Sequence, residues 1–279
     1  MTLLNQKETA REMNERASVA TAQADTEMKE LLDGAVERIN VPGFVEDDPV
    51  QFPRRFEKLQ DVETVALLSA IMAWGRRPMI LRDCERLLGL MEGRPCEYVL
   101  SGSWEELPDR LNIHRTMFAS HLKYMLRGLR EVYRKYGSLE AFCAACVPQG
   151  AEGAPWIFGE SLRRLLADVN GGAGCPECLP TRMDTTALKR VNMALRWLVR
   201  DDGVVDMGLW KCLKPSQLYV PLDVHVGNVS RSLGLLGRRA NDRKAVEQLT
   251  ASLRLYDPAD PVKYDFALFG LGVTGQLAD

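Results

Sequence analysis

Apolar residues recur at intervals of three and four along most of the chain, a pattern that is typical of amphipathic helices. Prolines and glycines interrupt it, as in VPGFVEDDPVQFP (41–53) and DPADP (257–261), which we interpret as irregular connections. We found no convincing strand pattern beyond short pieces such as QLYV (217–220). The expected helices cover residues 25–40, 61–74, 78–91, 112–147 (with a shorter helix from about 138), 155–169, 185–200, 224 to about 233, 240–255 and a terminal segment after 261. The sequence therefore predicts an all-α fold of roughly ten helices.

The helix predicted at 185–200 combines an apolar face with a basic one. Its polar stripe consists of Lys189, Asn192, Arg196 and Arg200. Met193 and Trp197 lie along one edge of this stripe. No acid occurs from 189 to 200, so these cations have no partner at i,i+4 spacing on their own helix. A solvated surface face is one interpretation. The other is that the cations bind an anion outside the chain.

A second signal lies at the start of the helix predicted from 224 to about 233. Asp223 directly precedes this helix, and aspartate is a preferred N-cap because its carboxylate accepts hydrogen bonds from the free N–H groups of the first turn. The helix dipole favours the ionised acid, and Pro221 helps to keep the preceding backbone extended. Asp223 is therefore either a simple cap or an ionised carboxylate held for chemistry.

The segment PLDVHVGNVSRSLGL (221–235) resembles the pattern V-D-T/V-H-V-x-R-x-x-x-R-L-G-L of the helix-hairpin-helix DNA glycosylases, the superfamily of endonuclease III and 8-oxoguanine glycosylase. The resemblance implies that Asp223 is the catalytic carboxylate. KRVNMALRWLVR (189–200) is similar to the helix that begins with the catalytic lysine of the bifunctional members, which implies that role for Lys189. The two residues are 34 positions apart, since 223 − 189 = 34, a longer spacing than in endonuclease III but comparable with the archaeal 8-oxoguanine glycosylases.

One part of the superfamily pattern is missing. Its hairpin L-P-G-V-G, whose backbone N–H groups bind a DNA phosphate, is replaced here by LPTRMDTT (179–186). We expect Asp184 or Thr185 to cap the lysine helix instead. The patterns DPVQFPRRF, VETVALLSAIMAWGRR and DPVKYDFALFGLG resemble an uncharacterised bacterial family, distantly related to these enzymes, across residues 27–275.

The superfamily resemblance implies two helical lobes with a cleft between them. Residues 25–77 would pack with 224–279 as one lobe, and 78–223 would form the middle lobe. Residues 1–24 are polar and are predicted to be a mobile tail. Lys189 and Asp223 would meet at the cleft, a common place for functional sites.

The function implied is a DNA repair glycosylase, with possible AP-lyase activity, that excises a damaged base such as an oxidised purine from double-stranded DNA. A base pocket would use Met193 and Trp197. DNA contacts would use the arginines Arg76, Arg77, Arg190, Arg196, Arg200 and Arg231. Two other interpretations stay open: a non-catalytic DNA-binding protein on the same scaffold, favoured by the missing hairpin, and a helical protein-interaction scaffold, favoured by the near-neutral charge.

Composition limits these possibilities only mildly. The net charge of −2 is less basic than is usual for DNA-binding domains, although acids are concentrated in the first 60 residues. No apolar run reaches the roughly 18 residues that span a bilayer, and the N-terminus has no signal core. We therefore expect a monomer of the bacterial cytosol or nucleoid, without membrane contact.

Seven cysteines suit reduced thiols in a cytoplasm. Two C-x-x-C pairs, Cys143 with Cys146 and Cys175 with Cys178, are separated by 28 residues, longer than the usual structural zinc spacing. We expect no metal or other cofactor, with a four-cysteine zinc site as the alternative. No cysteine follows Cys212, so the C-terminal iron–sulfur loop of endonuclease III is absent.

Overall fold

The computed structural model describes residue 23 and residues 25–273, so nearly all of the predicted tail at 1–24 lies outside the described residues. A first helix covers 25–39. The other α-helices are α2 (Pro42–Glu46), α3 (Leu59–Met72), α4 (Arg77–Leu90), α5 (Pro95–Ser101), α6 (Ala119–Tyr136), α7 (Leu139–Cys146), α8 (Ala154–Val169), α9 (Lys189–Val199), α10 (Val224–Ser232), α11 (Arg243–Arg254) and α12 (Tyr264–Val273). Short 3-10 helices are η1 (Pro49–Gln51), η2 (Pro53–Arg55), η3 (Ser103–Glu106), η4 (Pro215–Gln217) and η5 (Pro261–Lys263). The predicted helical class is confirmed.

A small antiparallel hairpin replaces the first part of the long helix predicted at 112–147. Strand β1 (Asn112–His114) pairs with β2 (Met117–Phe118), and α6 begins only at Ala119. Arg115 in the turn has a φ of 49°, a left-handed conformation that a continuing helix cannot contain. The prediction of a helix start at 112 was therefore wrong. The piece QLYV forms no strand in the structure.

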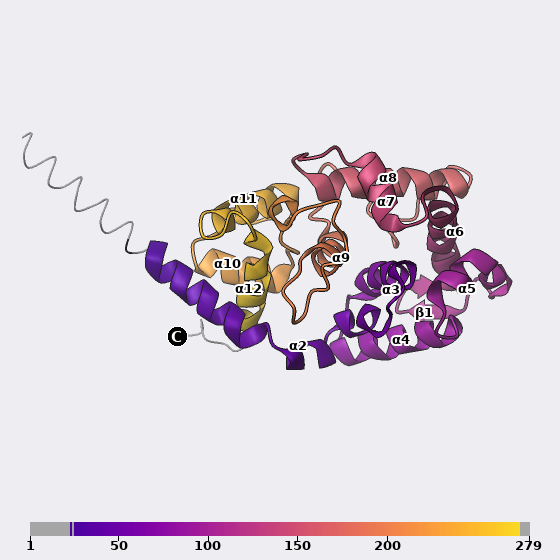
Figure 1. Cartoon of the computed structure of the whole chain (residues 1–279), viewed down its shortest axis with the longest axis horizontal. Helices are drawn as coiled ribbons and strands as arrows, with labels where there is room; N and C mark the ends of the chain where they lie inside the picture. The colour runs from indigo at the N-terminus through magenta and orange to yellow at the C-terminus, as the bar shows by residue number, and fades with distance from the viewer. Residues whose placement is uncertain (1–22, 24, 274–279) are drawn as a thin grey trace, which may run out of the picture.

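Helices α3 and α9 form the centre of the molecule (Figure 1). From Val62 to Met72, α3 is buried on every side, as expected for a helix that is apolar all round. It packs mainly against α9 and α5, and α10 packs against α12. None of the described helices is long and apolar enough to cross a membrane.

The N-terminal residues are shared between two groups of helices. The helix at 25–39 contacts η5, because Lys263 pairs with Asp33. Helix α2 contacts α12, because the ring of Phe44 lies edge-on to that of Phe266, with centroids 5.4 Å apart. In contrast, α3 lies beside α5 and α9 rather than with the C-terminal helices (Figure 1). Within residues 25–77, the first helix and α2 thus contact the C-terminal elements, whereas α3 packs beside α5 and α9. The division of the chain into two lobes stays a prediction.

A glycine allows α6 and α8 to approach closely. A Cβ atom at Gly128 would lie 2.2 Å from Cδ2 and 3.1 Å from Cγ of Leu166, which is fully buried and has no room to turn away. Gly89, in α4, faces open space.

We predict that Gly128→Ala destabilises the protein by about 1–3 kcal/mol through overpacking. Gly89→Ala, the matched control, should be neutral or stabilising by roughly 0.5–1 kcal/mol, because alanine favours the helix. Urea denaturation of both variants measures the free energy of unfolding. Equal stability of the two would contradict the close approach of α6 and α8.

Candidate active site

A cavity of about 960 Å³ lies where several parts of the chain meet. Its wall combines the α2–η1 segment, the turn between α3 and α4, the β1–β2 turn, the loop that leads into α9, α9 itself, the start of α10, and α12. The apolar part of the lining includes Phe44, Met193, Phe266 and Phe269. The polar part includes Lys189 and Asp223.

Lys189 and Asp223 form an ion pair in this cavity wall. Nζ of Lys189 lies 2.9 Å from Oδ2 of Asp223, with side-chain exposures of 35% and 29%. Oδ1 of Asp223 accepts a hydrogen bond from the N–H of Val226 at 2.9 Å, so Asp223 caps α10 as predicted. Burial raises the pKa of Asp223, but the charge of Lys189 and the Val226 N–H outweigh it, and the net pKa is lowered.

The backbone that presents Lys189 is held firmly. Leu188 precedes α9 with a φ of 52°, a left-handed conformation that costs a branched residue about 1–2 kcal/mol. Its side chain is buried, and its N–H donates to Oγ1 of Thr186 at 3.2 Å. The carbonyl of Thr186 accepts from Nε1 of Trp156 at 2.9 Å. The packed loop therefore maintains the strained geometry directly before the lysine.

Our expectation that Asp184 or Thr185 caps α9 was wrong. Leu188 occupies the N-cap position, and none of the described side chains caps this helix. The carbonyl of Thr185 instead accepts from the N–H of Arg243 at 2.9 Å, which ties the loop to α11. The segment 179–186, which replaces the glycine hairpin, is thus anchored to α11 by this hydrogen bond.

Arg196 and Arg200 have internal partners, contrary to our expectation. Arg196 is buried, with Nε 3.2 Å from Asp206 and Nη1 bonded to Asp265. Arg200 is also buried, 2.9 Å from Asp206 and 2.7 Å from Asp260. These acids come from the 201–207 loop and from the region of α12, so spacing within α9 alone did not reveal them. The two arginines are not available to bind DNA phosphates.

The other predicted arginines divide into two groups. Arg190 donates to the carbonyls of Ile71 at 3.0 Å and Glu177 at 3.3 Å, and Arg231 donates to carbonyls of the 238–239 segment. These two hold loops in place. Arg76 and Arg77 are exposed at the turn between α3 and α4. Arg77 also lines the cavity, with its guanidinium carbon 5.2 Å from the Phe269 ring centroid.

A buried histidine fixes this turn. His114 lies with Nδ1 2.7 Å from Oδ2 of Asp83 and Nε2 2.9 Å from the carbonyl of Trp74. The ring of His114 thus bridges the carboxylate of Asp83 in α4 and the backbone carbonyl of Trp74. Burial raises the pKa of Asp83, but hydrogen bonds from His114 and Arg82 outweigh it, and the net pKa is lowered. His114 is therefore a structural residue that positions the backbone before Arg76.

Met193 and Trp197, the predicted base pocket, differ in their positions. Met193 lines the cavity. Trp197 is fully buried and cannot contact a ligand there. The aromatic surface of the cavity comes instead from Phe44, Phe266 and Phe269.

Two carboxylates that line the cavity were not predicted from the sequence. Asp265, in α12, is nearly buried, and burial raises its pKa to about 6 although Arg196 opposes this. Asp48 accepts from the N–H of Val50 at 3.0 Å, and burial raises its pKa as well. A signal was present, because Asp265 is an acid directly before the apolar segment FALFGLG. A charge beside such a buried segment requires a partner.

The two cysteine pairs lie in different surroundings. Cys143 interacts with Cys212, whereas the sulfurs of Cys175 and Cys178 lie 2.9 Å apart near His121. No group of metal-ligating side chains in the described part of the chain combines the two pairs. The structure does not form the four-cysteine arrangement considered from the sequence.

The fold and site define a predominantly helical protein with a lysine–aspartate pair in a large cavity. Residues 48–274 match the family described as Protein of unknown function (DUF2400), and the chain belongs to this family. No curated protein and no solved structure matches the chain. The matched region contains Lys189, Asp223 and Asp265.

We predict that Arg196→Met destabilises the protein by about 3–5 kcal/mol at pH 8, because Asp206 and Asp265 lose a buried cation. The stability lost in Arg196→Met should be smaller at pH 5 than at pH 8. A buried carboxylate whose pKa is raised binds a proton more readily in the folded protein than in the unfolded chain. Its contribution to the free energy of unfolding therefore falls as pH rises from about 4 to about 6.

Denaturation with urea at both pH values measures this effect. Arg76→Met, at an exposed position, is the matched control and should change stability by about 0.5 kcal/mol or less. A mild, pH-independent effect of Arg196→Met would show that the buried ion pairs do not contribute as described.

Proposed function

We propose that the protein is a DNA glycosylase with AP-lyase activity, in which Lys189 attacks the sugar and Asp223 stabilises the developing charge. The observation that carries this proposal is the 2.9 Å pair of Lys189 and Asp223 in the wall of the cavity. These are the two residues at which the sequence resembles the helix-hairpin-helix glycosylases. They are 34 positions apart in the sequence, yet they meet in space.

The cavity suits an extruded nucleotide. Its volume of about 960 Å³ lies within the range of roughly 300–1,000 Å³ that is usual for ligand pockets. A base that leaves the DNA stack must be received by aromatic or apolar surface with a few polar groups. Phe44, Phe269 and Met193 supply that surface, and Asp48 and Asp265 supply acceptors or, when protonated, donors.

The chemistry follows from the two side chains. Once Lys189 has lost a proton, its Nζ lone pair forms a bond to C1′ while the bond from C1′ to the base breaks. The base leaves with that electron pair and takes up a proton. The sugar ring then opens as its oxygen is protonated, which leaves a Schiff base between Nζ and C1′. Loss of a C2′ proton expels the 3′ phosphate and cleaves the strand.

Asp223 acts through its charge in this scheme. Its lowered pKa keeps it ionised near neutral pH. Breaking the bond to the base places positive charge on the sugar, which a nearby carboxylate stabilises, as in glycoside hydrolysis. Because Asp223 also caps α10, its carboxylate is fixed before substrate arrives.

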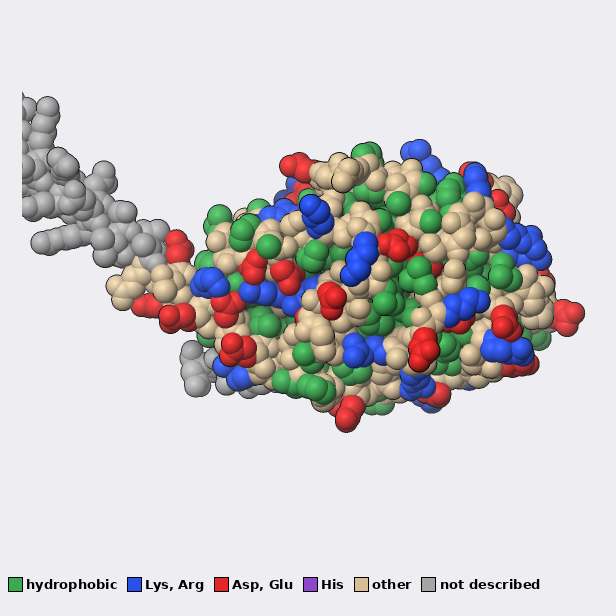
Figure 2. Space-filling model, in the orientation of Figure 1, with side chains coloured by type: hydrophobic (Ala, Val, Ile, Leu, Met, Phe, Trp, Pro, Cys, Tyr) green, Lys and Arg blue, Asp and Glu red, His purple; other side chains and the backbone are tan. Residues whose placement is uncertain are grey.

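Phosphate binding in this proposal depends on Arg76 and Arg77 at the exposed turn. Lys and Arg side chains are interspersed with Asp and Glu on the face shown in Figure 2, and this face carries no continuous basic surface. The contribution of charge to DNA affinity should therefore come from few contacts.

We predict that borohydride traps a covalent adduct between the protein and duplex DNA that contains an oxidised purine or an abasic site. Lys189→Gln should lose this adduct because the nucleophile is gone. Asp223→Asn should remain folded, because asparagine caps nearly as well as aspartate, but should slow base release by about 100-fold or more. Gel analysis of trapped DNA and of released base provides the measurements.

Lys211→Gln is the matched control. Lys211 lies in the same 34-residue interval, but its Nζ donates to the carbonyl of Gly208 at 2.6 Å and is not part of the cavity wall. It should retain the adduct. If wild-type protein gives no adduct and releases no base from a panel of lesions, the proposed chemistry is wrong.

We also predict that Arg76→Gln with Arg77→Gln lowers duplex affinity and reduces the slope of log affinity against log salt by about two, one for each phosphate contact. Arg134→Gln with Lys135→Gln removes an adjacent exposed pair at the end of α6 and should leave the slope unchanged. Fluorescence anisotropy at several salt concentrations distinguishes the two double variants. Equal slopes for the two double variants would show that the turn does not contact DNA phosphates.

A further inference from the structure

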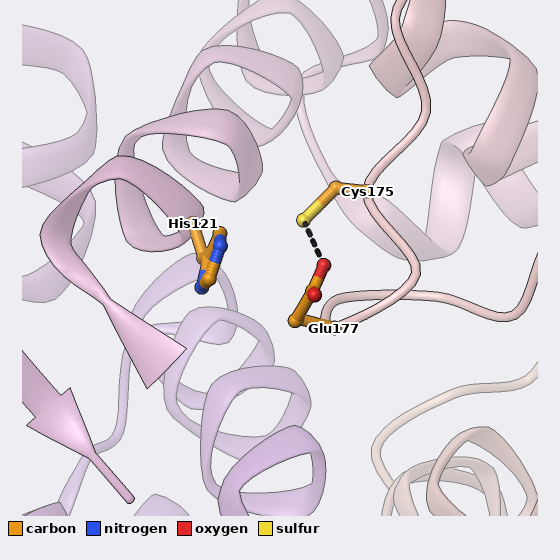
Figure 3. Close-up of side chains that lie close together, drawn as sticks. All are labelled: His121, Cys175 and Glu177. Atoms are coloured by element: carbon orange, nitrogen blue, oxygen red, sulfur yellow. Dashed lines mark hydrogen bonds between the residues drawn. The ribbon is translucent and has the colours of Figure 1, made fainter. Parts of the chain in front are cut away.

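A compact group of metal-ligating side chains lies beside the cavity, apart from Lys189 and Asp223. It consists of His121, in the first turn of α6, with Cys175 and Glu177 from the loop after α8 (Figure 3). One ligand atom from each lies within 4.8 Å of the others. We propose that these three residues, together with Cys178, bind one zinc ion.

The distances allow a tetrahedral site after small side-chain rotations. Oε2 of Glu177 lies 3.7 Å from Sγ of Cys175, and the two sulfurs lie 2.9 Å apart. Zinc bonds of about 2.3 Å to sulfur and about 2.0–2.1 Å to nitrogen separate neighbouring ligand atoms by roughly 3.3–3.8 Å. The sulfurs must therefore move apart by less than about 1 Å. Cys178 lies outside the group of three, so its side chain must also turn toward the other ligand atoms.

The donor set favours zinc over other common ions. Two thiolates, an imidazole and a carboxylate combine soft and borderline ligands, which suit zinc and not magnesium or calcium. Iron–sulfur clusters usually need four cysteines, and this group has two. The loop itself, GCPEC (174–178), brings both cysteines to one side of a turn, since the N–H of Cys178 donates to the carbonyl of Cys175 at 3.0 Å.

Binding requires a change at His121. Its Nδ1 now accepts from the N–H of Phe118 at 3.2 Å. Coordination through Nε2 would place the ring proton on Nδ1, so this long hydrogen bond would be lost. Phe118 is exposed, and water can accept from its N–H. The loss is small beside the gain of a metal–nitrogen bond.

A metal here would connect α6 with the loop that leads to the candidate nucleophile. Glu177 and Cys178 line the cavity, and the carbonyl of Glu177 accepts from Arg190 in α9. Sγ of Cys178 already lies 3.3 Å from the carbonyl of His121. Four protein ligands leave no open position, so the zinc would stabilise this wall of the cavity and would not catalyse a reaction.

The test uses the full chain, reduced and freed of metal with a chelator, and titrated with cobalt(II) and then zinc. One equivalent of cobalt should produce the thiolate charge-transfer absorption and the intense visible bands of a tetrahedral site, and zinc should remove both. Cys175→Ser should lose about half of the charge-transfer absorption, because only the Cys178 thiolate remains, or should no longer bind cobalt. Glu177→Gln, at an exposed position that tolerates the change, should bind cobalt more weakly.

The other C-x-x-C pair, Cys143 and Cys146, provides the matched control. Cys143→Ser with Cys146→Ser should keep the full cobalt spectrum, and so should Lys189→Gln, which separates this result from the proposed glycosylase chemistry. Fully reduced protein that binds no cobalt would overturn the proposal. So would a spectrum that is unchanged in Cys175→Ser, or one that disappears only in the Cys143 and Cys146 variant.

Discussion

Two buried arginines at the C-terminal end of α9, Arg196 in the helix and Arg200 directly after it, constrain the arrangement of the whole molecule. Removing a guanidinium group from water costs several kcal/mol, and this cost is offset only when carboxylates are placed correctly around it. Here the carboxylates belong to the 201–207 loop and to the chain around α12. Arg196 also lies over the Phe266 ring at 4.3 Å. The positions of α9, the loop and α12 therefore depend on one another through these ion pairs.

This constraint extends directly to the cavity. Lys189 begins the helix that carries Arg196, seven residues or roughly 10 Å away along a rigid axis. Asp265, which bonds to Arg196, lies one helical turn from Phe269 in α12. The same buried ion pairs therefore fix the relative positions of the lysine and of the aromatic wall. A cluster that the sequence suggested was a ligand-binding surface instead sets the geometry of the site.

Local signals in the sequence predicted well, whereas distant partners did not. The cap at Asp223 needs only the residues that follow it, and the helix limits near Pro78 and Gly75 depend on local backbone preferences. The partners of Arg196 lie 10 and 69 positions away, beyond the reach of any helical repeat. The β1–β2 hairpin was missed because its residues also fit a helical pattern, and the conformation of Arg115 decided between the two. The meeting of Lys189 and Asp223 came from family resemblance, not from periodicity.

The buried ring of His114 has a consequence for how the exposed turn meets any anion. Because this ring contacts the Trp74 carbonyl at 2.9 Å, the backbone before Arg76 is held in place in the folded protein. Ordering a residue's backbone costs roughly 1–2 kcal/mol of conformational entropy, and this cost was met during folding. Only the side chains of Arg76 and Arg77 remain to be immobilised. An anion that reaches this turn therefore meets a preorganised backbone, and the entropic penalty of association is confined to two flexible side chains.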